Sequence, residues 1–103
     1  AMPVIYNMIH TRPNTSAAWI ADEDPDFISD FQAKTNEYIA SGHIVSFTHS
    51  HPNDLEHHAT LTITDEAADT VIMADASWRY FGDTIFENYE LKGITTVQTR
   101  TVE

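Results

Sequence analysis

The sequence contains no cysteine and few basic residues. Because cysteine is absent, disulfide bonds, thiolate metal sites and cysteine nucleophiles are excluded. Five Lys and Arg stand against sixteen Asp and Glu, which gives a formal charge of -11 at pH 7. Nucleic acids and anionic membrane surfaces are bound by basic protein surfaces, so neither is expected as a partner of this acidic chain.

Long hydrophobic runs are also missing. No apolar stretch approaches the ~20 residues of a membrane-spanning helix. The N-terminal residues lack the charged and then apolar segments of a signal peptide. We therefore expect a cytoplasmic protein. A chain of 103 residues with 42% hydrophobic side chains is typical of a single globular domain, here residues 1–103.

The first third of the chain predicts a strand followed by a helix. Residues 4–9 (VIYNMI) are rich in strand-forming side chains. Asp24 can cap a helix, and Pro25 suits the first helical position. Apolar residues then recur at helical spacing up to Ile39, and Gly42 is expected to end the helix.

Residues 44–64 alternate with a period of two on both sides of a turn at Pro52, Asn53 and Asp54. This pattern predicts an antiparallel hairpin. One face of its first arm would carry Val45, Phe47, His49 and His51, and the other Ile44, Ser46, Thr48 and Ser50. With the turn centred near Asn53, we expect His49 to lie directly opposite His57.

The last third predicts a second, interrupted helix and a final strand. Thr64 or Asp65 can cap this helix, and the sequence ADAS at residues 74–77 is expected to break it. Ser77 would cap the continuation, which ends near Gly93. Residues 94–102 are rich in Thr and Val and predict a strand.

The element order β-α-β-β-α-β predicts a ferredoxin-like α+β fold, with a four-stranded antiparallel sheet and two helices on one face. The other face of the sheet would be rich in hydroxyl groups. Its expected members are Ser46, Thr48, Ser50, Thr60, Thr62 and Thr64. A second copy of the chain would cover this face, so we expect a homodimer with a partly wet interface.

The segment YFGDTIFENYELKGIT, Tyr80 to Thr95, has an aromatic pair and then a Gly-Ile that opens the last strand. With this segment the chain resembles the dimeric α+β barrel group, within it the antibiotic-biosynthesis-monooxygenase-like domains, over about residues 4–102. The resemblance implies a homodimer with a pocket between each sheet and its helices. Some members oxidise polycyclic aromatic molecules without metal or flavin, so no cofactor is implied; others degrade heme or are isomerases.

The resemblance also implies site residues. Asn7 and Trp78 match the catalytic positions, with Asn7 as a hydrogen-bond donor to a substrate oxyanion. Tyr80, or alternatively Tyr89, would supply a catalytic hydroxyl group. Phe81, Ile85 and Tyr89 would line the substrate pocket. The helix after Trp78 has no histidine, which argues against heme degradation. Asn7 as a surface residue and Trp78 as part of a core-packing helix stripe are the simpler structural interpretations.

Four of the six histidines lie between Ser46 and Thr60. His49, His51 and His57 would share one face of the hairpin, and three imidazoles plus water form an open metal site. A solvated polar hairpin end is the alternative. His58 would face the other way, while His10 and His43 look isolated.

Three hypotheses therefore remain open. The chain is a homodimer that binds or oxidises a small apolar or aromatic molecule without a cofactor, a non-enzymatic structural dimer, or a metal-binding protein built on the histidines.

Overall fold

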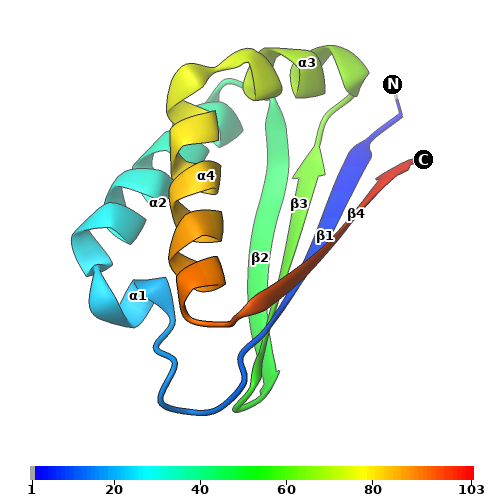
Figure 1. The fold of residues 1–103 in the computed structure, drawn as a ribbon. Coiled ribbons are helices and arrows are strands. Elements are labelled where there is room, and N and C mark those ends of the chain that lie inside the picture. The colour runs from blue at the N-terminus through cyan, green and yellow to red at the C-terminus, as the bar shows by residue number, and fades with distance from the viewer. Residues whose placement is uncertain (1) are drawn as a thin grey trace.

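A computed structural model describes residues 2–103, which form four strands and four helices (Figure 1). In chain order they are β1 (Val4–Thr11), α1 (Ile20–Glu23), α2 (Pro25–Ala40), β2 (Ile44–Asn53), β3 (Glu56–Ile63), α3 (Glu66–Ala74), α4 (Ala76–Leu91) and β4 (Thr95–Val102). The sheet order is β2-β3-β1-β4, and every neighbouring pair is antiparallel. The helices cover one face of the sheet (Figure 1). The predicted ferredoxin-like α+β fold is confirmed.

Aspartate side chains begin three of the helices. Asp24 accepts a hydrogen bond from the backbone N–H of Phe27, and Pro25 opens α2, as predicted. Asp65 caps α3 by accepting from Ala68. The predicted cap at Ser77 is wrong: Asp75 accepts from the Ser77 N–H, because its carboxylate reaches the unpaired donors of the first turn of α4.

A β-bulge near the start of β2 changes the predicted faces of the hairpin. Ile44 pairs with Ile63, but the next paired residue is Ser46, which pairs with Thr62. Val45 is therefore the extra residue and is 58% exposed, while Ile44 is buried. The prediction that placed Val45 with Phe47 and Ile44 with Ser46 is wrong at these two positions and holds from Ser46 onward.

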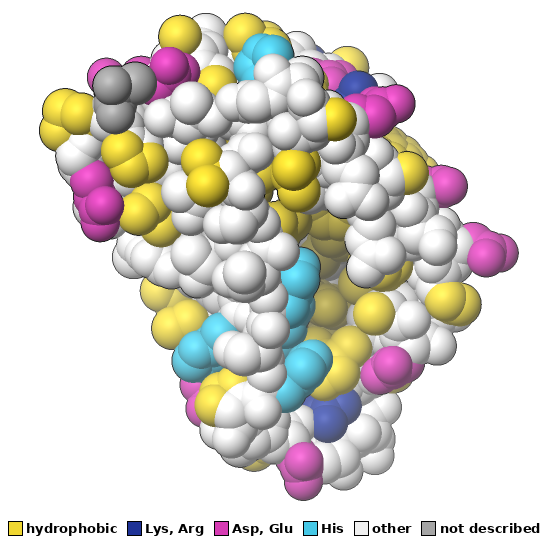
Figure 2. Space-filling view, turned by 180° about the vertical axis from the view of Figure 1, so that it is seen from behind, with side chains coloured by type: hydrophobic (Ala, Val, Ile, Leu, Met, Phe, Trp, Pro, Cys, Tyr) yellow, Lys and Arg dark blue, Asp and Glu magenta, His cyan; other side chains and the backbone are white. Residues whose placement is uncertain are grey.

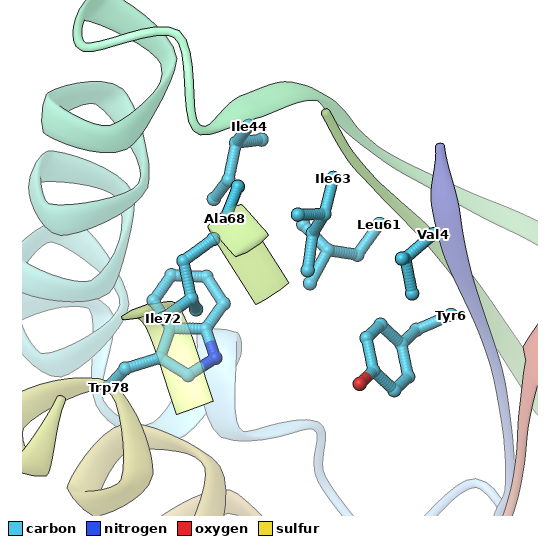
Figure 3. Close-up of a cluster of buried hydrophobic side chains, with 8 residues drawn as sticks. All are labelled: Val4, Tyr6, Ile44, Leu61, Ile63, Ala68, Ile72 and Trp78. Atoms are coloured by element: carbon cyan, nitrogen blue, oxygen red, sulfur yellow. The ribbon is translucent and has the colours of Figure 1, made fainter. Parts of the chain in front are cut away.

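The core consists of two clusters. Figure 3 shows the first, in which side chains from the sheet meet Ile72 of α3 and Trp78 of α4; its members are Val4, Tyr6, Ile44, Leu61, Ile63, Ala68, Ile72 and Trp78. The second contains Trp19, Ile20, Tyr89 and Ile94. Helix α4 contributes to both, through Trp78 and Tyr89. Partly buried side chains, including Phe31, Phe47 and Ile85, pack against one cluster or the other.

Asp75, between α3 and α4, joins three elements. Besides capping α4, its carboxylate accepts a hydrogen bond from the Tyr38 hydroxyl and pairs with the Lys34 ammonium at 3.1 Å. The hydrogen bonds from Tyr38 and Lys34 lower the pKa of Asp75 to about 2. The ionised carboxylate therefore ties α2 to the α3–α4 junction.

Replacing Asp75 with Ala removes a helix cap and the carboxylate that Tyr38 and Lys34 contact. We expect Asp75→Ala to lower the free energy of unfolding by about 2 kcal/mol, measured by urea denaturation at pH 7. Asp83→Ala is the matched control, because Asp83 is exposed on the same helix and the same charge is lost. An equal loss of unfolding free energy in the two variants would show that the contacts of Asp75 do not stabilise the fold.

A candidate site in the histidine-lined cleft

Four histidines form a cluster on the helix-facing side of the sheet, here called the histidine cluster: His10, His49, His51 and His57. His10 on β1 lies directly opposite His57 on β3. The His57 ring is central, with ring centroids 5.4 Å from His10, 5.2 Å from His49 and 4.9 Å from His51. Two adjacent strand pairs therefore bring four imidazoles to one end of the sheet.

The pairing within the hairpin differs from the prediction. The two-residue turn is at Asp54 and Leu55, and the register shifts between Ser50 and Asn53. The Cα partner of His49 is therefore Ala59, so the predicted direct opposition of His49 and His57 is wrong. The two side chains nevertheless meet diagonally, with Nδ1 of His49 3.1 Å from Nε2 of His57.

His10 was expected to be isolated, and the structure contradicts this. It is 8% exposed, and its Nδ1 lies 2.8 Å from the hydroxyl oxygen of Thr96. A signal for this placement is present in the sequence. His10 follows Val4, Tyr6 and Met8 at a period of two, and that set is the buried face of β1.

Two aromatic residues enclose the histidine cluster on the helix side. Tyr89 of α4 meets His10 edge-on at 5.1 Å. The Trp19 ring, just before α1, lies 5.7 Å from His51 and 5.9 Å from His57. The Tyr89 hydroxyl accepts a hydrogen bond from the Ile20 N–H, which fixes α1 against α4. Sequence reasoning missed Trp19, because a one-turn helix has too few residues for a periodic pattern.

Burial keeps the inner imidazoles uncharged. Desolvation, with a smaller contribution from His49, lowers the pKa of His10 to about 4. Desolvation and the neighbouring histidines lower the pKa of His57 to about 3. The pKa of His49 is also lowered, mainly by desolvation and then by His51. Neutral imidazole has one donor and one acceptor nitrogen, so the His49–His57 contact is an N–H···N hydrogen bond.

A metal site is predicted at His49, His51 and His57, and the orientation of the three rings can be compared with what a metal ion requires. The planes of His49 and His51 lie within 13° and 23° of that of His57. A metal ion needs ring nitrogens that converge on one point. Among residues 2–103, no group of three His, Asp or Glu side chains is arranged to hold a metal ion.

Figure 2 shows a cleft with histidine side chains along one wall, hydrophobic side chains on its floor and a basic side chain at one end. A continuous series of ring contacts leads from Phe31 of α2 to the histidines. Phe31 meets Phe47 at 5.8 Å, and Phe47 meets His49 at 4.6 Å. Beside the histidines is a cavity of about 230 Å³, lined by Arg12, Trp19, His51, Asn53 and Asp54. The cleft thus offers aromatic surface and imidazole nitrogens together.

The structure separates the three residues expected to be catalytic. Asn7 is exposed on the sheet face away from the helices, where its side-chain oxygen accepts from the Thr60 hydroxyl. Trp78 is 7% exposed in the core, and Tyr80 is 61% exposed. A single pocket shared by Asn7 and Trp78 is not formed within one chain, because the sheet lies between them.

The three residues expected to line the pocket lie closer to the cleft. Phe81 is half-buried and stacks on Phe31 at 5.2 Å. Ile85 packs against the second core cluster. Tyr89, a member of that cluster, contacts His10 of the histidine cluster. One face of α4 therefore contacts Phe31 at Phe81 and the histidine cluster at Tyr89.

Solved structures with the same architecture include SnoaB, a cofactor-independent oxygenase from Streptomyces nogalater. The two chains share 16% sequence identity over 100% of this chain and 94% of that one, with a TM-score of 0.61. This chain has the fold of SnoaB. A SnoaB mutant with one Asn replaced by Ala gives a TM-score of 0.58 at 15% identity, over 99% and 92% of the two chains.

At 16% identity this likeness concerns the fold. No family model and no curated protein sequence matches the chain. Within residues 2–103, none of the helices has the length and apolar character needed to cross a membrane.

The histidine cluster predicts a loss of stability in mild acid. His10 and His57 have folded-state pKa values below the ordinary 6.5, so the unfolded chain binds protons first as the pH falls. The stabilisation is complete above about pH 6.5 and is lost as the pH falls toward 4 and 3. Between pH 7 and pH 5 we expect a loss of about 2 kcal/mol or more, on the order of 10 °C in Tm, measured by thermal melts.

Relief of repulsion among the acidic residues acts in the opposite direction, so two variants isolate the histidines. His57→Phe keeps a ring in the cluster and should flatten the pH dependence of Tm. His43→Gln changes a histidine outside the cluster and should leave the dependence as in the wild type. A wild-type slope retained by His57→Phe would rule out this explanation.

Proposed function

We propose that this protein binds a small planar aromatic molecule in the histidine-lined cleft and oxidises it with molecular oxygen, without a cofactor. The observation that carries the proposal is the contact of neutral imidazoles with an aromatic cleft wall, from Phe47 through His49 to His57. Ligand sites combine apolar surface with a few convergent polar groups. The fold shared with a cofactor-independent oxygenase supports the same reaction class.

The chemistry needs a base more than a metal. Removing a proton from a phenol, or from a CH2 group that is conjugated with a ketone through an aromatic ring, gives an electron-rich anion that can react directly with O2. In the overall reaction the CH2 becomes C=O, one oxygen atom enters the substrate, and the other leaves as water. The two hydrogens of the CH2 group end in that water, so no external reductant is required.

His49 is the proposed general base. It is exposed on the cleft wall, while the hydrogen bond to His57 fixes its ring. If the Nδ1–H of His49 donates to His57, its Nε2 is an unprotonated acceptor that can face the substrate. His57 then acts as a positioning residue, because its low pKa keeps it neutral. In this proposal Phe81, Ile85 and Tyr89 contact the substrate, and Trp78 supports α4 from the core.

Anthrone, a three-ring ketone with an acidic CH2 group, is a suitable test substrate. We expect the protein to accelerate its conversion to anthraquinone, followed by absorbance and by oxygen uptake. His49→Gln removes the base and should lower kcat by about 100-fold, the usual contribution of general base catalysis. His43→Gln should retain the wild-type rate.

Two results would count against the proposal in different ways. Full activity in His49→Gln would eliminate His49 as the base. Binding of anthrone with no turnover above the buffer rate would favour the non-enzymatic alternative, in which the cleft only carries a ligand.

We further propose that the protein is a homodimer that pairs through the helix-free face of its sheet. Ile9 and Val97 are cross-strand partners on this face and are 37% and 60% exposed. Around them the face carries hydroxyl side chains such as Thr60, Thr62 and Thr99, which can hydrogen-bond across an interface. Asn7 would then lie in the dimer interface.

Light scattering of the protein as it leaves a size-exclusion column should give twice the mass of the chain. Val97→Lys places a charge on the proposed interface and should shift the protein to monomer at micromolar concentration. Gln98→Lys is the matched control, since Gln98 is the next residue on β4 and is also exposed but points to the helix side. Equal masses for both variants would exclude this face as the interface.

A further inference from the structure

Arg12 differs from most basic residues of this chain. Lys34, Lys92 and Arg100 are paired with carboxylates of Asp75, Glu23 and Asp69. Within residues 2–103, Arg12 has no carboxylate within ion-pair distance. In a chain with a formal charge of -11, a cation held without an acidic partner is available to an anionic ligand.

Backbone carbonyls hold the Arg12 guanidinium in place. Its Nε donates to the carbonyl oxygen of Asp54 at 2.6 Å, and one terminal nitrogen donates to that of Ala17 at 3.1 Å. The guanidinium carbon lies 4.8 Å from the centre of the Trp19 ring. These contacts fix its orientation and leave the second terminal nitrogen, Nη2, without a hydrogen-bond partner among the described residues. An oriented guanidinium binds carboxylates well because its donors match their geometry.

The cavity of about 230 Å³ beside Arg12 connects this cation to the histidine cluster. Trp19 and His51 line the cavity. His51 belongs to the histidine cluster, where its ring stacks on that of His57, and the Trp19 ring contacts both His51 and His57. A planar ligand whose rings lie against the histidines could therefore extend a substituent to Arg12. The cavity is below the usual size of a complete ligand site and has room for a carboxylate with bound water.

From this arrangement we infer that the natural ligand is an aromatic molecule with an anionic substituent, a carboxylate, which Arg12 binds in the cavity beside Trp19 and His51. The inference rests on the proposed function only in placing the rings of the ligand in the cleft. It adds the class of the preferred substrate: an aromatic molecule that carries a carboxylate, which should bind more tightly than a neutral molecule with the same rings. Asp54 also lines the cavity, and its carboxylate weakens the binding of an anion.

Naphthalene carboxylate and its carboxamide are a matched pair of probes, because they share the ring system and differ in charge. We expect the carboxylate to bind about tenfold more tightly at low salt, measured by the change in tryptophan fluorescence and, for Trp19 itself, by the NMR shift of its indole N–H. High salt should reduce the preference, since the site opens to solvent.

Variants assign the preference to Arg12. Arg12→Gln should bind the two probes equally, whereas Arg79→Gln, an exposed arginine on α4, makes the same charge change and should keep the preference. Asp54→Asn removes the repulsive carboxylate and should strengthen carboxylate binding a few-fold. This variant keeps Arg12 and therefore tests the site even if Arg12→Gln does not fold.

The outcomes separate the inference from the proposed function. Equal binding of both probes to the wild type, or a preference that survives in folded Arg12→Gln, would overturn the anion site and leave the aromatic cleft intact. Binding of neither probe at millimolar concentration would overturn both.

Discussion

Helix α4 determines the spacing on which the cleft depends. Trp78 anchors its first turn in one core cluster, and Tyr89 anchors its last turns in the other. Eleven residues of α-helix separate the two anchors by about 16 Å. Because a helix is stiff, the distance between the two clusters is fixed, and Phe81 and Ile85, both partly buried, lie between the two anchors on α4. Figure 1 shows α4 lying along the covered face of the sheet.

Most of the fold could be predicted from the sequence, because its signals are local. The alternation in β1 and β3, the proline after Asp24 and the left-handed glycines after α2 and α4 mark elements within a few residues. The bulge at Val45 and the register shift after Ser50 could not be predicted. They depend on how the strand fits its neighbour and the helices, which a single strand does not encode.

The candidate site could be predicted only in part, and the reasons differ by residue. The hairpin pattern predicts that His49 and His57 share a face, and their side chains meet in the structure. His10 joins them from a distant strand, yet the period-two pattern of β1 already puts it on the face of Val4 and Tyr6. The same pattern puts Asn7 on the opposite face, away from Trp78. The family resemblance alone does not predict this separation of Asn7 and Trp78, because a resemblance compares residue types and not the directions of their side chains.

The bulge at Val45 also makes the two edges of the sheet unequal. β2 and β4 are the outer strands, and each presents backbone N–H and C=O groups that a foreign strand could pair with. In β2 the bulge breaks the even spacing of these groups. β4 pairs with β1 without a break from Thr95 to Val102, so its outer side keeps a regular row. Unwanted strand addition and fibril growth are therefore disfavoured at β2, and β4 is the edge through which this protein would aggregate.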